Sequence, residues 1–411
     1  MIQKPRGTED LFGDKAKQYL ALELIIRNIA ENFNFNEIKT PMFESSDLFK
    51  SNVGESTDIV TKEMYNFLDK KNRELTLRPE GTVPTVRAII ENKLYIQENL
   101  PLKLFYFSKM FRYERPQKGR MREFSQFGVE VFGPNSPELD SELISFCFMI
   151  LNSIGLKNYK LNINYIVTNE ERKKYIVELK KYLSSKKLCD DCATRINTNL
   201  LRVLDCKIDR HQFDDIIDMK DFLSEEDKKF YNELKRNIKN IGIEFIEDKK
   251  LVRGLDYYTG LVYEIVDQDG ITIIGGGRYN NLVEKMANIN LQASGFGVGM
   301  ERLLISLDNQ NISLFESYKL DAFLIALTDK AKALSNILLF MLRNSNLKVD
   351  LEYMNKNLKS AFKSAERYNP KSIIIIGDNE IKENVVIIKN QDTKKEEKVS
   401  FDKIVDYLKK G

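Results

Sequence analysis

Apolar and polar positions alternate most clearly over residues 111–133, where two runs with strand character flank a short basic loop. Successive side chains of a strand point to opposite faces, so alternate residues share a face. One face of the return run holds a polar pair with a glycine between them, which is suited to the floor of a site for a small polar ligand. The two sets are Ser125, Phe127, Val129 and Val131 on one face, and Gln126, Gly128 and Glu130 on the other.

Helical and strand periods alternate over the first 160 residues, and prolines mark several of the changes. Pro41 indicates a strand end or an edge strand, because proline cannot donate a hydrogen bond to a sheet. Ser136 followed by Pro137 is typical of a helix start. The expected elements are a helix at 15–34, a strand around position 41, a strand at 74–78, a helix at 83–90, a hairpin at 102–133 and a helix at 136–154.

The middle of the chain changes character between about residues 170 and 240, where lysine-rich helical sequence replaces the strand signal. We interpret this segment as an inserted helical subdomain. Strand patterns resume at 243–246, 261–266 and 271–274, and residues 295–307 read as a glycine-rich strand that leads into a helix. Strands grouped in hairpins with separate helices predict an α+β core, residues 1–316, around an antiparallel sheet.

The last part of the chain has a different pattern. Residues 309–319 resemble a linker, and residues 320–411 contain four apolar runs, the first three separated by helical sequence. This order predicts a C-terminal α/β domain with a largely parallel sheet. Basic residues recur at helical spacing on one face of it, at Lys356, Lys359, Lys363 and Arg367, and such a stripe is either a solvated face or a nucleic-acid contact.

Composition describes an ordinary globular protein of 411 residues, of which 42% are hydrophobic and 30% charged. The chain begins without an apolar run and has no stretch long enough to cross a membrane, so we expect a cytoplasmic protein with no membrane partner. Lys plus Arg (64) nearly balances Asp plus Glu (61), but residues 320–411 contain seventeen basic and thirteen acidic residues. That excess is compatible with RNA binding by the C-terminal domain.

The single histidine, His211, makes a hydrolase with a histidine base improbable unless this residue serves as the base. Three thiols and an imidazole, at Cys189, Cys192, Cys206 and His211, are able to bind zinc in principle. Their spacing matches no common zinc finger, so we interpret them as reduced, structural thiols and expect no structural metal.

Two glycine runs, at 275–277 and 295–299, match neither the dinucleotide-binding fingerprint nor the phosphate-binding P-loop. If ATP binds, arginines must hold its phosphates, and the candidates are Arg112, Arg120 and Arg302. A second dense stretch, residues 251–265, places Arg253, Asp256, Tyr257 and Tyr258 in a turn between glycines. Tyrosine pairs usually belong to the core, but the adjacent charges favour a site.

Six stretches together resemble the histidyl-tRNA synthetases, a family of class II aminoacyl-tRNA synthetases, along essentially the whole chain. They are PRGTED, TLRPEGT, FRYERPQKGRMREFSQFGVEVFG, LVRGLDYYTG, GGGRY and GFGVGMERL. The resemblance implies the class II antiparallel sheet with flanking helices, a homodimer and a C-terminal anticodon-binding domain. It also implies a two-step reaction. Histidine and ATP, with Mg²⁺, give histidyl-adenylate, and the histidyl group then passes to the terminal adenosine of tRNA(His).

Site residues follow from the resemblance at matching positions. Arg112 and Arg253 are expected to stabilise the α-phosphate, Arg253 from the side where other class II enzymes hold a metal ion. The implied histidine site is Glu80, Gly81, Thr82, Arg112, Gln126, Glu130, Arg253, Tyr257, Tyr258 and Tyr279, with Glu130 and Tyr258 at the imidazole. The implied ATP site is Arg112, Glu114, Arg120, Phe124 and Arg302. The implied tRNA contacts are Gln117 and Lys118 in the basic loop, with Lys359 and Lys363 in the tail.

Three other functions remain open at this stage. One is a histidine-binding regulatory paralogue that controls ATP phosphoribosyltransferase, a subunit that usually lacks the C-terminal domain and the ATP arginines. Another is a class II synthetase for a different amino acid, such as proline or threonine. The last is an RNA-binding protein without activity.

Overall fold

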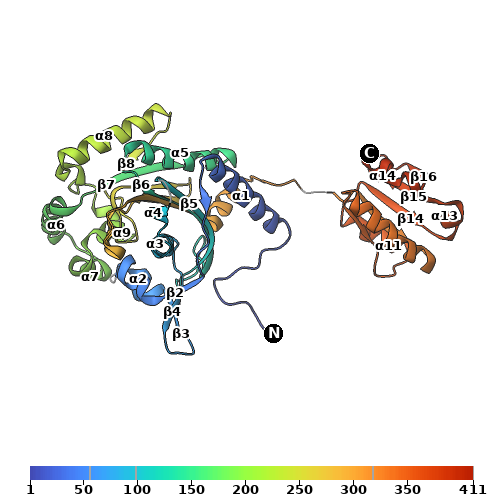
Figure 1. Ribbon diagram of the computed structural model, residues 1–411, viewed down its shortest axis with the longest axis horizontal. Coiled ribbons are helices and arrows are strands. Elements are labelled where there is room, and N and C mark those ends of the chain that lie inside the picture. The colour runs from blue at the N-terminus through green and yellow to red at the C-terminus, as the bar shows by residue number, and fades with distance from the viewer. Residues whose placement is uncertain (55–56, 98–99, 317–318, 411) are drawn as a thin grey trace. The chain divides into compact units, whose positions relative to one another are not determined.

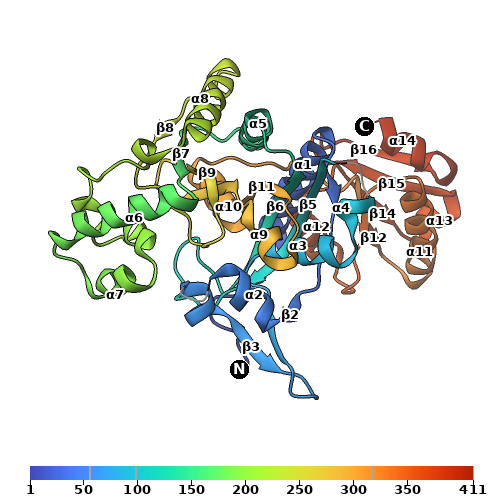
Figure 2. The ribbon, with the colours of Figure 1, turned by 60° about the vertical axis from the view of Figure 1, so that its left-hand side comes forward.

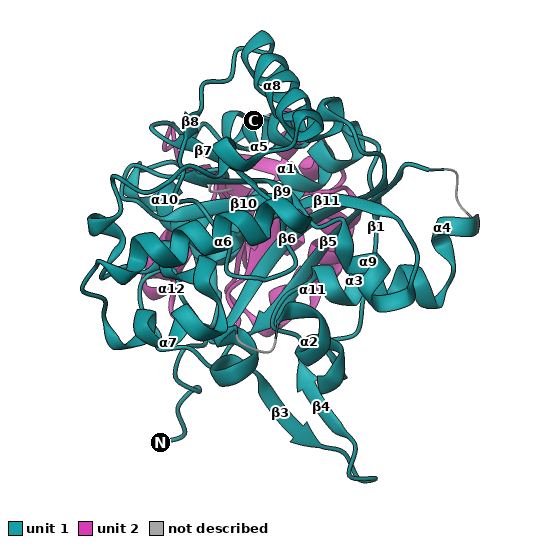
Figure 3. Cartoon of the chain, turned by 90° about the vertical axis from the view of Figure 1, so that its left-hand side faces the viewer, with its two compact units in different colours: residues 1–315 teal, residues 316–411 magenta. Residues whose placement is uncertain are grey.

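Two compact units make up the protein, whose computed structural model describes residues 1–54, 57–97, 100–316 and 319–410. The first unit is Met1–Phe315 and the second is Glu316–Gly411 (Figure 3). Part of the predicted linker, residues 317 and 318, lies outside the described residues. Within the described ranges, no helix has both the length and the apolar character needed to cross a lipid bilayer.

An eight-stranded sheet forms the centre of the first unit, in the order β1-β5-β6-β11-β10-β9-β7-β8. The six strands from β5 to β7 pair antiparallel, whereas the short outer strands β1 and β8 pair parallel with their neighbours. The predicted α+β class is therefore confirmed, with one short parallel strand at each edge of the sheet. The strands are β1 Asn36–Glu37, β5 Leu102–Phe111, β6 Glu123–Gly133, β7 Lys160–Ile166, β8 Ile246–Glu247, β9 Thr259–Val266, β10 Thr272–Arg278 and β11 Gln292–Gly299.

Helices α1 (Gly13–Asn32), α5 (Pro137–Ser153) and α10 (Met300–Asn309) pack on the apolar face of this sheet (Figure 1). Phe127 and Val129 of β6 are fully buried against them. The predicted start of α5 is confirmed, because the Ser136 hydroxyl accepts a hydrogen bond from the backbone N–H of Leu139 at 3.3 Å. The opposite, polar face of β6 is left for the site.

A smaller three-stranded sheet lies before the hairpin, in the order β2-β4-β3. The strand expected around position 41 is not formed: Pro41 falls in the connection between the short strands β1 and β2, where its missing N–H is not needed for a sheet hydrogen bond. Helix α3 follows β4 after a turn of four residues, so the sequence that connects them is held close to the main sheet. The elements of this region are β2 Phe43–Ser45, α2 Ser46–Val53, η1 Ile59–Glu63, β3 Tyr65–Leu68, β4 Glu74–Leu77, α3 Thr82–Glu91, α4 Leu94–Gln97 and α9 Asn281–Ala287.

The predicted helical insertion is confirmed between β7 and β8, and its helices lie at one end of the unit (Figures 1 and 2). Helix α8 packs on α5, and buried side chains such as Tyr175 and Leu234 join the core of the sheet. The insertion is therefore packed against the eight-stranded sheet and its helices. Its elements are α6 Asn169–Ser184, α7 Asp190–Thr198, η2 Leu200–Asp205, η3 Arg210–Gln212, η4 Met219–Phe222 and α8 Glu225–Asn240.

The second unit is a five-stranded sheet in the order β13-β12-β14-β15-β16, with helices around it. Its first three strands are parallel, as the sequence predicts, but β15 and β16 are antiparallel. The connection from β14 to β15 is too short for a parallel crossover, which needs a dozen or more residues. The elements are β12 Ala322–Ala326, α11 Asp329–Asn344, β13 Val349–Leu351, α12 Leu358–Glu366, β14 Ser372–Ile376, α13 Asp378–Glu383, β15 Val385–Asn390, β16 Glu396–Ser400, η5 Phe401–Lys403 and α14 Ile404–Lys410.

Candidate active site

A cavity of about 200 Å³ opens over the polar face of β6, between the basic loop that follows β5 and the turn that precedes β9. Most of the side chains that the sequence predicts for the site line this cavity. They are Glu80, Thr82, Arg112, Glu114, Arg120, Phe124, Gln126, Glu130, Arg253, Tyr257, Tyr258, Tyr279 and Arg302. Gly81, Gln117, Lys118, Lys359 and Lys363 do not line it.

Glycines of the neighbouring strands leave the space in which the polar side chains of the floor lie. In the sheet register, Gly297 of β11 is opposite Gly128 of β6 and Gly275 of β10. A Cβ atom at Gly297 would collide with the Gln126 amide, and one at Gly275 would collide with the Arg253 guanidinium. The two glycine runs that match no nucleotide motif therefore have a steric role in this fold.

Three hydroxyl groups hold the carboxylate of Glu130 at the centre of the floor. Thr82 donates to Oε1 at 2.8 Å, Tyr106 donates to the same oxygen at 3.4 Å, and the Tyr279 hydroxyl donates to Oε2. Burial raises the pKa of Glu130 to about 8, although these hydroxyl donors act in the opposite direction. A carboxylate has about four acceptor positions, so roughly one remains for an N–H group of a ligand.

The carboxylate of Glu80 is fixed at the start of α3, on the edge of the same cavity. It accepts hydrogen bonds from the backbone N–H groups of Thr82 at 2.9 Å and Val83 at 2.8 Å, and from the Tyr257 hydroxyl at 3.3 Å. Burial raises the pKa of Glu80, and the two N–H donors oppose that shift. Gly81, which precedes α3, has no room for a Cβ because the Tyr106 ring lies against it.

Two polar atoms of the cavity residues are buried without a hydrogen-bond partner among the described residues: Oε1 of Gln126 and Nε of Arg253. One is an acceptor and the other is a cationic donor. Buried polar groups in native structures are almost always paired, so each unpaired atom calls for an explanation. A ligand that has both a donor group and an anionic group would satisfy the two atoms together.

The guanidinium of Arg253 is oriented by a carboxylate of β9. Its Nη1 lies 3.3 Å from Oε2 of Glu264, and the same oxygen accepts a hydrogen bond from the Thr272 hydroxyl at 3.2 Å. Glu264 lies outside the cavity lining. It therefore positions Arg253 without taking a place in the cavity itself.

Four arginines surround the cavity and concentrate positive charge there. Arg302 donates from Nε to the carbonyl of Gly119 at 2.8 Å and from Nη1 to the carbonyl of Thr272 at 2.9 Å. Burial, followed by the charges of Arg120 and Arg112, lowers the pKa of Arg302 to about 10. A protonated arginine so close to other arginines favours a polyanion as its partner.

The remaining ATP-site candidates contact one another beside this cluster. The Arg112 guanidinium lies 5.3 Å from the ring centroid of Phe124, and its Nε donates to the carbonyl of Pro79 at 2.8 Å. Nη1 of Arg120 lies 3.4 Å from Oε2 of Glu114. These contacts hold an aromatic ring, a carboxylate and two guanidinium groups around one end of the cavity.

The tRNA-contact candidates lie in two places. Gln117 forms a two-residue bridge with Arg120 that closes the tip of the basic loop, and Lys118 donates to the side chain of Asn309 at 3.3 Å. In the second unit, Lys359 and Lys363 are exposed on α12.

Sequence reasoning missed Tyr106 and Glu264. Tyr106 lies in an apolar run of β5 and resembles a core residue, but it pairs with Gly128 in the sheet and reaches Glu130 with its hydroxyl. Its role depends on strand register, which the sequence of one strand does not disclose. Glu264 lies in an alternating run of β9, and its side chain points to Arg253.

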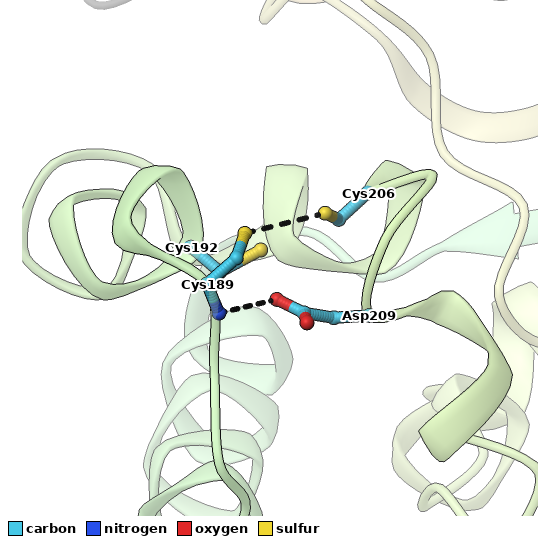
Figure 4. A group of neighbouring side chains, drawn as sticks. All are labelled: Cys189, Cys192, Cys206 and Asp209. Atoms are coloured by element: carbon cyan, nitrogen blue, oxygen red, sulfur yellow. Dashed lines mark hydrogen bonds between the residues drawn. The ribbon is translucent and has the colours of Figure 1, made fainter.

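The cysteine group of the insertion differs from its sequence interpretation in one residue. Ligand-capable atoms of Cys189, Cys192, Cys206 and Asp209 lie within 4.8 Å of one another (Figure 4). His211 is exposed, and its Nδ1 is 2.7 Å from the carbonyl of Ile208. The fourth residue of the group is therefore Asp209 and not His211.

Comparison with known proteins matches both units of the chain. The histidyl-tRNA synthetase family matches residues 7–303, and the anticodon-binding domain family matches residues 321–411. The histidine–tRNA ligase of Mycoplasma mycoides subsp. mycoides is 50% identical over 100% of both chains. That of Mesoplasma florum is 51% identical over 100% of this chain and 90% of its own, and that of Staphylococcus saprophyticus is 41% identical over 100% of both.

Solved structures give the same result for the fold. The crystal structure of apo Staphylococcus aureus histidyl-tRNA synthetase matches with a TM-score of 0.84 at 36% identity, over 100% of both chains. A Bacillus halodurans protein described as an ATP phosphoribosyltransferase regulatory subunit/histidyl-tRNA synthetase matches with a TM-score of 0.66 over 92% of this chain and 98% of its own. Its identity of 22% supports a shared fold only.

Proposed function

The chain belongs to the histidyl-tRNA synthetase family, and on that premise we propose that it joins L-histidine to tRNA(His) in two steps. ATP, as its Mg²⁺ complex, first activates the histidine carboxylate to histidyl-adenylate with release of pyrophosphate. The histidyl group then passes to the 3′ adenosine of the tRNA. The protein is thus an aminoacyl-tRNA ligase, and residues 1–316 form the catalytic part in this proposal.

The observation that supports this function best is the pair of unpaired atoms in the cavity. Oε1 of Gln126 suits an ammonium group, and Nε of Arg253 suits an anion. A free amino acid has an ammonium group and a carboxylate, and its adenylate has a phosphate in addition. We assign the ammonium group of histidine to Gln126, Glu80 and Thr82.

Selection of histidine follows from the state of Glu130. Three hydroxyl donors leave its carboxylate about one acceptor position, which suits one N–H of an imidazole ring. Tyr258, which lines the same cavity beside Tyr257 and Tyr279, is the proposed partner of the other ring nitrogen. A site built on such hydrogen bonds discriminates strongly against side chains that lack them, because its own polar groups would be left unpaired.

Activation of histidine by ATP depends on positioning the two substrates and on neutralising the phosphate charge more than on proton transfer. The carboxylate of histidine is already a nucleophile, so its attack on the α-phosphate requires no general base. The proposed roles of Arg112 and Arg253 are to hold the α-phosphate from two sides and to stabilise the charge that develops there. Arg253 suits this role because Glu264 fixes its orientation.

The rest of ATP is assigned to the end of the cavity that holds the other arginines. Arg120 and Arg302 are proposed to bind the distal phosphates. Phe124 is proposed to stack on the adenine, and Glu114 to accept from its amino group. Burial, followed by repulsion from the neighbouring guanidinium groups, lowers the pKa of Arg302, and the negative charge of a polyphosphate would stabilise the protonated side chain against both effects.

The tRNA is assigned to the basic loop and to the second unit. Gln117 and Lys118 are proposed to meet the acceptor end, and Lys359 and Lys363 to contact the anticodon part through residues 320–411. The match of the second unit to the anticodon-binding family supports this division. Assembly as a homodimer and a cytoplasmic location are family expectations that we include in the proposal.

The regulatory alternative is not favoured. The relatives that match over the full length of this chain at 41–51% identity are histidine–tRNA ligases. The regulatory paralogue usually lacks the ATP-binding arginines. Here all four line the cavity: Arg112, Arg120, Arg253 and Arg302.

Charging of tRNA(His) with radiolabelled histidine tests the proposal. We expect acid-precipitable product that depends on ATP, on histidine and on tRNA(His). Binding of histidine without any charging, under conditions where a control histidyl-tRNA synthetase is active, would contradict it.

A further inference from the structure

The group of Cys189, Cys192, Cys206 and Asp209 lies in the insertion, outside the catalytic cavity (Figure 4). Cys189 precedes α7 and Cys192 lies in its first turn. Cys206 follows η2, and Asp209 precedes η3. We propose that these four side chains bind one zinc ion, which closes the insertion as a structural site.

The spacing of the residues along the chain is that of two matched pairs. Cys189 and Cys192 are separated by two residues, and so are Cys206 and Asp209. Structural zinc sites commonly consist of two such pairs joined by a longer segment. The spacing becomes recognisable once Asp209 replaces His211 as the fourth ligand.

The one sulfur–sulfur distance that the structure gives within the group fits a tetrahedral ion. Sγ of Cys189 lies 3.7 Å from Sγ of Cys206. Thiolates bind zinc at about 2.3 Å, so two of them on a tetrahedral ion lie about 3.8 Å apart. A disulfide would bring the sulfur atoms to about 2.05 Å. The ligand atoms of all four side chains lie within 4.8 Å of one another, so small side-chain movements would bring them around a common ion.

The buried carboxylate of Asp209 supports a cation at that centre. Its residue is 2% exposed, and it forms no ion pair with a Lys or Arg in the described ranges of the chain. It accepts hydrogen bonds from the backbone N–H of Cys189 at 3.0 Å and from the Gln212 side chain at 3.3 Å. Burying a carboxylate without a cation is costly, whereas bonds of this kind commonly orient a metal ligand.

The donor set selects zinc. Three thiolates favour zinc, Cu(I) or an iron–sulfur cluster, and the addition of a carboxylate oxygen in a tetrahedral arrangement favours zinc among these. Cys192 is fully buried and Cys206 is 5% exposed, so four protein ligands would leave the ion closed to substrate. Such a site stabilises structure and takes no part in the chemistry.

The segment between the two pairs, residues 193–205, is where the insertion meets the catalytic turn. Arg202 donates from Nη1 to the carbonyl of Arg253 at 3.4 Å, and the Asn199 amide donates to Asp256 at 2.6 Å. An ion bound at both ends of this segment would restrict its movement. Zinc would therefore hold the backbone of Arg253 in place from outside the cavity.

Metal analysis of the purified full-length protein tests the site. We expect one zinc ion per chain by mass spectrometry, and the absorption bands of tetrahedral thiolate-bound Co²⁺ after replacement of the metal. Cys206→Ser and Asp209→Asn should lower the zinc content, whereas Cys147→Ala, in the core of α5, should retain it. Wild-type protein that takes up neither zinc nor Co²⁺ overturns the proposal, and so does zinc that persists in both ligand variants.

Hydrogen exchange tests the link to the catalytic turn. Removal of the ion with a chelator should increase exchange at residues 195–202 and 253–256, while β14 in the second unit remains unchanged. Equal exchange at 253–256 with and without the ion would overturn the link. Neither measurement uses catalytic activity, so both remain decisive if the proposed function fails.

Discussion

The hydroxyl of Thr82 donates a hydrogen bond to Oε1 of Glu130 at 2.8 Å and thereby joins the start of α3 to the centre of β6. Glu80, two residues before Thr82, brings a second buried carboxylate to the same cavity. Burial, and to a lesser extent the charge of Glu80, raises the pKa of the Glu130 carboxyl in the ligand-free protein, whereas the hydroxyl donors lower it. The arrangement concentrates hydrogen-bonding groups that a polar ligand can use.

Stability of the ligand-free protein should therefore fall as pH rises. Burial raises the folded-state pKa of Glu130 from 4.5 to about 8, so the folded protein holds more protons than the unfolded chain between these values. This contribution is fully present below about pH 4.5 and is lost as the pH passes about 8. Glu130→Gln, which imitates the protonated side chain, should flatten that decline. Melting temperatures measured from pH 5 to 8.5 check the difference, and equal slopes for the two proteins would contradict it.

Arg253→Ala should abolish most of the adenylation activity. Loss of one preorganised group that stabilises the transition state typically lowers kcat by about 10²–10³-fold. Histidine-dependent ATP–pyrophosphate exchange measures the effect. Arg236→Ala is the matched control, since Arg236 is exposed on α8 and pairs only with Glu233 among the described residues. Unchanged exchange in Arg253→Ala would remove Arg253 from the catalytic group.

Gly275→Ala should act through Arg253. The added Cβ would collide with the guanidinium group, and a displacement of about 1 Å in a catalytic group can cost about 100-fold in rate. In an Arg253→Ala background the same substitution should have little further effect, because the two changes remove one interaction. Pyrophosphate exchange by all four proteins gives this double-mutant cycle. If the losses of exchange rate in the two single variants add in the double variant, the effect of Gly275→Ala does not pass through Arg253.

Charge reversal at Lys359 and Lys363 should weaken charging of tRNA and leave pyrophosphate exchange intact. If both lysines meet phosphates, the salt dependence of tRNA binding should fall by about 1 in slope for each. The same reversal at Lys409 and Lys410, exposed on α14, provides the control. Equal tRNA affinity in the two double variants would mean that the lysine stripe of α12 is a solvated face.

Much of the first unit could be predicted because local patterns and motifs agree there. The alternation along β6 separates the buried Phe127 from the cavity residue Gln126, and the Ser136–Pro137 pair marks the start of α5. These features depend on one segment at a time. The spacing of apolar residues along the segment and the residues typical of helix starts are therefore sufficient to predict them.

Features that depend on two distant segments could not be predicted. Tyr106 reaches the site because β5 pairs with β6 in a particular register. The glycine runs matter because their missing side chains leave room for Gln126 and Arg253, which lie on other segments. Asp209 joins the cysteine group because the chain turns after Cys206, which no cysteine or histidine motif records. The antiparallel end of the second sheet likewise follows from the length of one connection.

The most direct measurement of the central claim is ATP–pyrophosphate exchange by the wild-type protein with each of the twenty amino acids in turn. The proposed roles of Glu130 and Tyr258 predict exchange with histidine and background rates with every other amino acid. Equal stimulation by a second amino acid, or no exchange with histidine, would contradict the account.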